Sequence, residues 1–221
     1  MNDRLTDITV VLDRSGSMSR LRQDTIGGIN TFITDQKAFD GDATFTLVQF
    51  DDKYEVNYTS RNLKEVSLLG TNDFVPRGST ALLDAMGRTI NATGERLSSI
   101  PEDQRPGKVI FVIMTDGYEN ASKEFNYDQV KTMVEHQTAQ YNWQFVYLGA
   151  NQDAILVGNS IGIAASNSLT YAASGPGIHT AHVAVNKNTR AFRSGLTKSY
   201  TFTDNDRTEQ EELLKNGGTS R

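Results

Sequence analysis

Two short apolar runs, far apart in the chain, constrain the fold more than any other feature. Residues 8–12 are mostly β-branched and stop at Asp13, and residues 109–114 stop shortly before Asp116. Short apolar runs of this kind are typical of parallel strands that are buried on both faces, because helices cover both sides of such a sheet. The sequence therefore predicts an α/β fold in which two central strands each end at an acidic residue.

The segments around these runs alternate between strand and helix patterns. Helical spacing of apolar residues predicts helices over residues 20–38, 81–98, 127–140 and 177–194, with a short helix after Asp153. Further strands are predicted over residues 43–50, 54–58, 144–148 and 168–171. The tight turn between the strands at 43–50 and 54–58 predicts an antiparallel hairpin, since parallel neighbours need a long crossover. We therefore expect a doubly wound, mostly parallel central sheet with one antiparallel edge strand and helices on both faces.

Length and composition favour one domain. The chain has 221 residues, of which 37% are hydrophobic, and this is enough to build a sizeable core. We expect a single domain over residues 1–199. The acidic run at residues 209–212 and the Gly217-Gly218 pair predict a polar, flexible tail over residues 200–221.

From charge and hydropathy, we expect some classes of partner to be absent. The formal net charge is -5 and no dense basic run occurs, so we expect neither nucleic acid nor an anionic membrane as a partner. No run reaches the roughly 18 apolar residues of a membrane span. Residues 1–7 lack the apolar stretch of a signal peptide, which predicts a cytoplasmic protein. The chain has no cysteine, which excludes disulfides. The oligomeric state is not predicted.

Three short polar segments fall where strands or loops are expected to lead into helices. They are Asp13-Arg14-Ser15-Gly16-Ser17, Gly78-Ser79-Thr80 and Thr115-Asp116-Gly117. Each alone reads as an ordinary turn or helix cap. Together they bring two carboxylates and three hydroxyls to the carboxyl edge of the predicted sheet, where ligands of open α/β sheets bind. An all-oxygen set without histidine or cysteine suits a hard cation such as Mg²⁺ and does not suit zinc or copper.

These residues resemble the von Willebrand factor type A (vWA) family. Its metal-ion-dependent adhesion site (MIDAS) is written Asp-x-Ser-x-Ser, then a threonine after a Gly-Ser or similar turn, then an aspartate in a Thr-Asp-Gly turn. The resemblance covers about residues 5–195, and every ligand position is filled, by Asp13, Ser15, Ser17, Thr80 and Asp116. The wording around Asp13 and Asp116 is similar to stand-alone bacterial and bacteriophage members more than to animal adhesion receptors.

The resemblance implies a Rossmann-like vWA fold and a role for each site residue. Ser15 and Ser17 would bind the ion directly, Thr80 would do so in the ligand-ready state, and Asp13 and Asp116 would act directly or through water. Mg²⁺ is the expected ion, and Mn²⁺ or Ca²⁺ also fit. The resemblance further implies a metal-dependent protein-binding module, not an enzyme, whose ion bridges to a glutamate or aspartate of a partner protein.

Two other functions stay open at this point. The first is a magnesium-dependent phosphoryl-transfer or hydrolytic enzyme. The sequence gives it little support, since it has no P-loop motif, and an aspartate-nucleophile phosphatase would need an acid at the position of Ser15. The second is a scaffold protein with a purely structural ion, whose removal would lower thermal stability.

Charged residues flank the expected site. They are Arg14, Arg20, Arg77 and Glu119. Two interpretations are equally weighted for each of them: a contact that sets partner choice, or a solvated loop charge.

Overall fold

The computed structural model describes residues 1–217, and within them the strands form one sheet in the order β3-β2-β1-β4-β5-β6. The strands are β1 (Asn2–Asp13), β2 (Asp42–Phe50), β3 (Tyr54–Asn62), β4 (Pro106–Thr115), β5 (Gln144–Ala150) and β6 (Ser168–Tyr171). All neighbours pair in parallel except β2 and β3, which form an antiparallel hairpin at the sheet edge. The predicted mostly parallel sheet with one antiparallel edge strand is confirmed.

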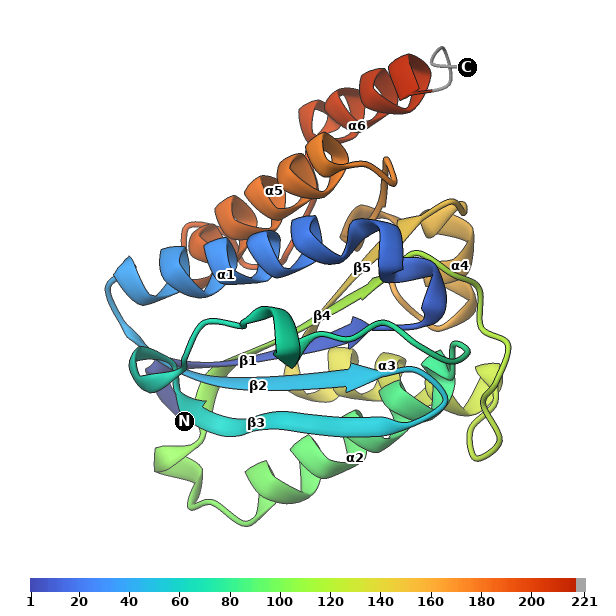
Figure 1. Ribbon diagram of the computed structural model, residues 1–221. Coiled ribbons are helices and arrows are strands. Elements are labelled where there is room, and N and C mark those ends of the chain that lie inside the picture. The colour runs from blue at the N-terminus through green and yellow to red at the C-terminus, as the bar shows by residue number, and fades with distance from the viewer. Residues whose placement is uncertain (218–221) are drawn as a thin grey trace.

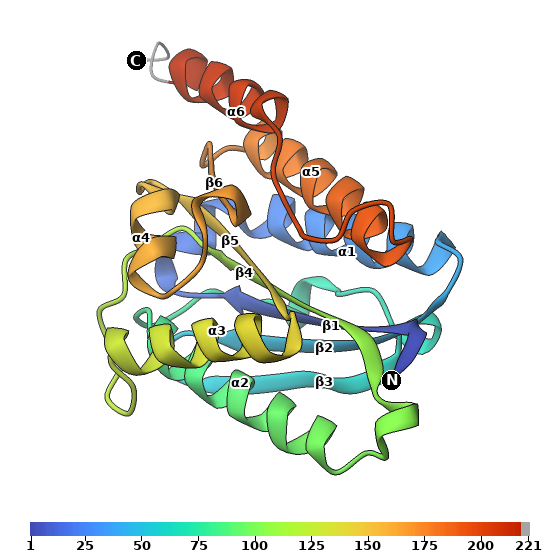
Figure 2. The same ribbon diagram turned by 180° about the vertical axis from the view of Figure 1, so that it is seen from behind.

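Helices lie on both faces of this sheet. They are α1 (Arg22–Ala38), α2 (Leu82–Ser98), α3 (Tyr127–Tyr141), α4 (Ala154–Ser160), α5 (Gly175–Arg193) and α6 (Asp204–Gly217). Helices α1 and α5 cover one face, and α2 and α3 cover the other (Figure 1). The view from behind shows the same three layers, with α6 beyond α5 (Figure 2). The predicted doubly wound arrangement is therefore also confirmed.

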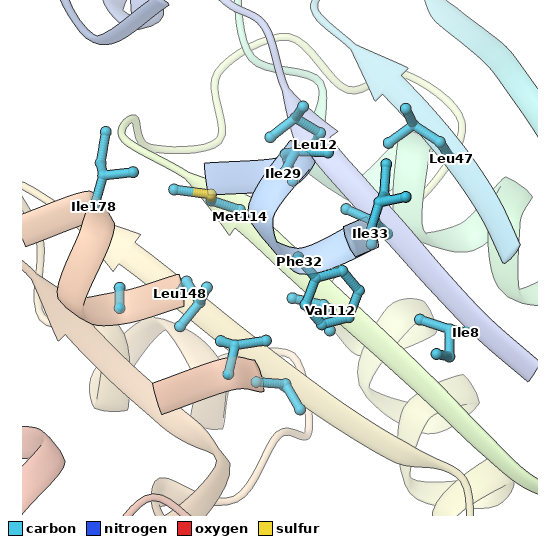
Figure 3. Close-up of a cluster of buried hydrophobic side chains, with 14 of the residues drawn as sticks. Ile8, Leu12, Ile29, Phe32, Ile33, Leu47, Val112, Met114, Leu148 and Ile178 are labelled. Carbon is cyan, nitrogen blue, oxygen red and sulfur yellow. The ribbon is translucent and has the colours of Figure 1, made fainter. Parts of the chain in front are cut away.

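Apolar side chains fill the space on each side of the sheet. Figure 3 shows Ile29, Phe32 and Ile33 of α1 beside Val112 and Met114 of β4. All five are buried, and each such side chain contributes roughly 1.5–3 kcal/mol when it leaves water. This packing fixes α1, and with it the loop that precedes α1, relative to the end of β4.

On the other face, aromatic rings cover the strands beneath α2 and α3. The Trp143 ring stacks on Phe111 with ring centroids 5.4 Å apart, and Phe145 lies tilted against Phe111 at 5.0 Å. All three residues are buried. Offset and tilted aromatic pairs of this kind add stability beyond the area that they bury.

The polar segment after residue 200 differs from the sequence-based expectation. Residues 204–217 form helix α6, where a flexible tail was predicted; residues 218–221 lie outside the described residues. Gln210 is buried: its side chain accepts from the Ala172 amide at 3.0 Å and donates to the Gly177 carbonyl at 2.9 Å. Polar groups of this segment pair with α5 and with β6 and the residue after it, and composition does not reveal such pairing.

The sheet has its topological switch point between β1 and β4. The chain leaves β1 through α1 on one face, whereas it leaves β4 through α3 on the opposite face (Figure 1). Asp13 is the last residue of β1 and Thr115 the last of β4. In open α/β sheets this is the edge at which ligands bind. Among the described residues, none of the helices combines the length and apolar character needed to span a membrane.

Candidate metal centre

Asp13 lies at the base of the candidate site. Its carboxylate is completely buried, and it accepts the Ser15 amide at 2.6 Å and the Thr115 hydroxyl at 2.5 Å. Burial raises the pKa of Asp13 to about 6, because the loss of hydration outweighs these hydrogen bonds. A cation beside Asp13 would act in the opposite direction, because an adjacent positive charge favours the ionised carboxylate.

The two serines of the first segment lie beside each other, next to Asp13. The hydroxyl oxygens of Ser15 and Ser17 are 3.0 Å apart, and the Ser17 hydroxyl donates to Asp116 Oδ1 at 2.5 Å. Ser15 is buried, whereas Ser17 is exposed. The short helical turn Gly16–Leu21 begins between them and places the Ser17 hydroxyl beside the second carboxylate, that of Asp116.

Asp116 has one oxygen that the protein does not satisfy. Its Oδ2 is buried and has no hydrogen-bond partner within residues 1–217. Burial also raises the pKa of Asp116 above its ordinary range, although the charge of Arg20 acts in the opposite direction. A buried carboxylate oxygen without a partner is costly unless an ion or water completes it. Of the features of the site, this buried oxygen without a partner is the one that best fits a bound cation.

Thr80 reaches the same place from the Gly78-Ser79-Thr80 segment. A Cβ built on Gly117 would lie 3.2 Å from the Thr80 hydroxyl and 3.6 Å from the Ser17 hydroxyl. The Thr80 amide donates to the Asn120 side chain at 2.9 Å, so the loop after β4 holds the threonine in place. The five residues named by the sequence motif thus converge from three loops at one edge of the sheet.

The donor set consists of oxygen atoms alone. Residues 1–217 contain no cluster of three or more His, Cys, Asp or Glu side chains arranged to hold a metal. The candidate centre has two carboxylates, and its other donors are hydroxyls. Hard cations accept such a set, since they bind carboxylate, hydroxyl and water oxygens together.

Of the four flanking charges, Glu119 has a role that neither sequence-based interpretation included. Its carboxylate accepts the amides of Leu83, Ala121 and Ser122 at 3.0, 2.9 and 2.8 Å. Glu119 therefore caps the start of α2 and shapes the loop after β4. Sequence patterns miss this contact because Leu83 lies 36 residues away from Glu119.

Arg14 also differs from both interpretations. It is 5% exposed, and its Nε donates to Asp51 at 3.1 Å, so it is neither a solvated charge nor a surface contact. Arg20 is exposed beside Asp116, as expected for the rim of a site. Thr115 and Asn120, which position Asp13 and Thr80, were not singled out by the sequence motif.

Comparisons with known proteins give the fold a name. No protein-family model matches the sequence, and no curated protein matches it. Among solved structures, a von Willebrand factor type A protein from Catenulispora acidiphila superposes with a TM-score of 0.54 at 12% identity, covering 84% of this chain and 42% of that one. This chain has the vWA fold.

Two further structures with the vWA fold are similar. Proximal thread matrix protein 1 from the mussel byssus, solved with a zinc-occupied MIDAS motif, gives a TM-score of 0.59 at 17% identity over 84% of this chain and 46% of that one. The pilus adhesin SpaC from Lactobacillus rhamnosus GG, in its open conformation, gives 0.61 at 13% identity over 84% of this chain and 30% of that one. The chain thus spans less than half the length of each of these proteins.

Proposed function

We propose that this chain is a vWA-type, metal-dependent protein-binding module. A divalent cation held by Asp13, Ser15, Ser17, Thr80 and Asp116 would bridge to a Glu or Asp side chain of a partner protein. The observation that carries the proposal is the buried Asp116 Oδ2, which has no partner in the described part of the chain, beside the Ser17 hydroxyl at the switch point.

The residues suit an ion that stays available to a partner. Ser15, Ser17 and Thr80 offer neutral hydroxyl oxygens, and the Asp13 carboxylate already accepts two hydrogen bonds from the protein. When bound, the cation supplies an electrophilic centre that can accept one more oxygen ligand. The exposed Ser17 leaves the site open to solvent on one side, so a carboxylate of another protein can approach it.

The similar structures support the general class. One carries zinc in its MIDAS motif and another is a pilus adhesin. For this chain we propose Mg²⁺ as the ion, with Mn²⁺ or Ca²⁺ as alternatives, because the donors are hard oxygens. We propose no catalytic step, and we assign residues 1–199 to the vWA module, with α6 packed on it as an addition.

Titration calorimetry with Mg²⁺, Mn²⁺, Ca²⁺ and Zn²⁺ tests the ion site. We expect the wild type to bind at least one cation and Asp13→Ala plus Asp116→Ala to bind none, because the two carboxylates carry the negative charge of the site. Glu211→Ala plus Glu212→Ala is the matched control, since it removes two exposed carboxylates from α6. Equal binding by all three proteins would contradict the site.

An affinity pull-down from native lysate tests the bridging role. We expect a protein to be retained by the wild type in magnesium buffer and to be lost with chelator or with the double Asp variant. A partner that is retained equally in every lane would contradict bridging. Retention in chelator, combined with a melting temperature that rises with metal, would assign the ion a structural role instead.

A further inference from the structure

Four charged side chains form a connected network directly behind the candidate metal site. Asp51 Oδ2 accepts Arg14 Nε at 3.1 Å and Arg77 Nε at 2.8 Å. Glu55 accepts both guanidiniums as well, Arg14 at 2.7 Å and Arg77 at 2.6 Å. Hydrogen bonding by Arg14, with that of Arg77, lowers the pKa of Glu55 to about 2. Two carboxylates and two guanidiniums therefore balance each other in charge.

The network joins two of the three ligand-bearing loops. Arg14 lies between Asp13 and Ser15, and Arg77 lies in the segment that leads to Thr80. Asp51 follows β2 directly, and its side chain is 0% exposed. Asp51 thus connects the two loops from the turn after β2, a segment that supplies none of the proposed ligands.

Backbone contacts follow the same path. The Arg77 amide donates to the Arg14 carbonyl at 2.8 Å, and the Gly16 amide donates to the Gly78 carbonyl at 3.2 Å. The Ala81 amide, next to Thr80, donates to the Asp51 carbonyl at 2.9 Å. The loop that carries Thr80 is therefore hydrogen-bonded to the loop that carries the serines.

The turn at Gly78 restricts how far these two loops can move apart. Gly78 has φ +66°, a left-handed conformation that favours glycine, and a Cβ there would lie 2.2 Å from Asp52 Oδ1. The chain around Gly78 is thus held closely against the segment that contains Asp51. If Asp51 loses its charge, both Arg14 and Arg77 lose a carboxylate partner, and Arg14 is buried.

We infer that Asp51 is a positioning residue of the candidate metal site, which holds the Thr80 hydroxyl against the Ser15 and Ser17 hydroxyls through Arg14 and Arg77. This inference rests on the proposed function. Asp51 acts through other residues and is not itself a ligand. Residues behind the ligands of metal sites commonly alter affinity about 10–100-fold when they are replaced.

A double-mutant cycle on Mg²⁺ affinity tests this role. We expect Asp51→Asn to weaken Mg²⁺ binding about tenfold or more, and to have a clearly smaller effect when Thr80→Ala is already present, because Asp51 acts in part by placing Thr80. Glu124→Gln is the matched control, since Glu124 pairs with Arg88 in an exposed ion pair. Independent, additive losses of affinity from Asp51→Asn and Thr80→Ala would overturn the inference, as would unchanged affinity in Asp51→Asn.

A second readout does not depend on metal. In metal-free protein we expect Asp51→Asn to speed amide hydrogen exchange at Gly16 and Ala81 about tenfold or more, and to leave Val134 in α3 unchanged. If the wild type binds no cation, the proposed function fails, and exchange alone decides the coupling: faster exchange in both loops supports it and unchanged exchange overturns it. If Asp51→Asn does not fold, Arg77→Gln serves in both experiments, since it keeps the buried Arg14–Asp51 pair.

Discussion

The Thr115 hydroxyl donates to Asp13 Oδ2 at 2.5 Å and joins residues that are 102 positions apart in the sequence. Thr115 and Asp13 are the last residues of β4 and β1, which pair in parallel at the switch point of the sheet. The two residues are close in space because β1 and β4 pair in parallel and end side by side at the same edge of the sheet. The contact makes Asp13 a shared element of the fold and of the candidate metal centre.

Thr115→Val is expected to lower the free energy of unfolding by about 1–3 kcal/mol. Valine keeps nearly the shape of threonine but removes the hydroxyl that donates to the buried Asp13 carboxylate. Urea denaturation of the metal-free protein measures this. Thr132→Val is the control. The Thr132 hydroxyl donates to the Asp128 carbonyl on the exposed side of α3, so the loss of this hydrogen bond should change stability little. Equal effects of the two substitutions would show that the Thr115–Asp13 contact contributes no particular stability.

Gly27 and Gly28 are neighbours in α1 with opposite expected responses to alanine. A Cβ at Gly28 would lie 2.1 Å from His182 Cδ2 in α5, so Gly28→Ala should destabilise the protein by about 1–3 kcal/mol through overpacking. At Gly27, a Cβ would meet no atom within 4 Å in the described part of the chain, apart from its chain neighbours and the nearby backbone of α1. Gly27→Ala should therefore stabilise the protein by about 0.5–1 kcal/mol, since alanine favours the helix. Thermal or urea unfolding of both variants measures the two changes in stability. If both substitutions stabilise the protein, or both destabilise it, the α1–α5 packing at Gly28 is contradicted.

His182 is expected to make the protein less stable in weak acid. Burial lowers its pKa from 6.5 to about 4, and its Nε2 has no hydrogen-bond partner among residues 1–217. Between these values the unfolded chain binds the proton and the folded one does not, so stability is fully present above pH 6.5 and falls as the pH is lowered. The expected loss from this group between pH 7 and pH 5 is about 2 kcal/mol.

Urea unfolding of wild type and His182→Gln at several pH values measures that loss. The comparison with the variant is needed because Asp13, with its raised pKa, contributes with the opposite sign in the same pH range. His179 and Asp24 line the same cavity as His182 and stay unchanged in both proteins. Identical pH dependence in the two proteins would contradict a neutral, buried His182.

Gln210→Ala is expected to detach α6 from the start of α5. It removes the bonds to the Ala172 amide and the Gly177 carbonyl, and it leaves both backbone groups without that partner. We expect a loss of about 1–3 kcal/mol in unfolding free energy and faster proteolysis within α6. Glu212→Ala, which changes an exposed residue of the same helix, is the control. Equal protease resistance in both variants would contradict the docking of α6.

Much of the fold was readable from local sequence patterns. The apolar runs that end near Asp13 and Asp116 predicted central parallel strands, and their order along the chain placed both acids at one sheet edge. Strand limits were less well predicted: β3 extends to Asn62, beyond the expected residue 58, because an edge strand that is largely exposed lacks a strong apolar alternation.

The convergence of Ser15, Ser17, Thr80 and the two aspartates was predicted from motif and topology together, and their binding of a metal stays a proposal. Individual roles of charged residues were not predictable in this way. The buried state of Arg14 depends on Asp51, and the capping role of Glu119 depends on the start of α2. Neither partner is near in sequence, so no local pattern records the pairing.

The sequence by itself determined which segments become strands and helices, because hydrophobic periodicity acts over neighbouring residues. It also determined the donor chemistry of the candidate centre, since oxygen is the only donor that Asp, Ser and Thr offer. Only the tertiary structure decided that Asp51 ties Arg14 to Arg77 and that Gln210 anchors α6. These contacts join residues distant in the chain, and the close packing of strands and helices alone brings them within hydrogen-bonding range.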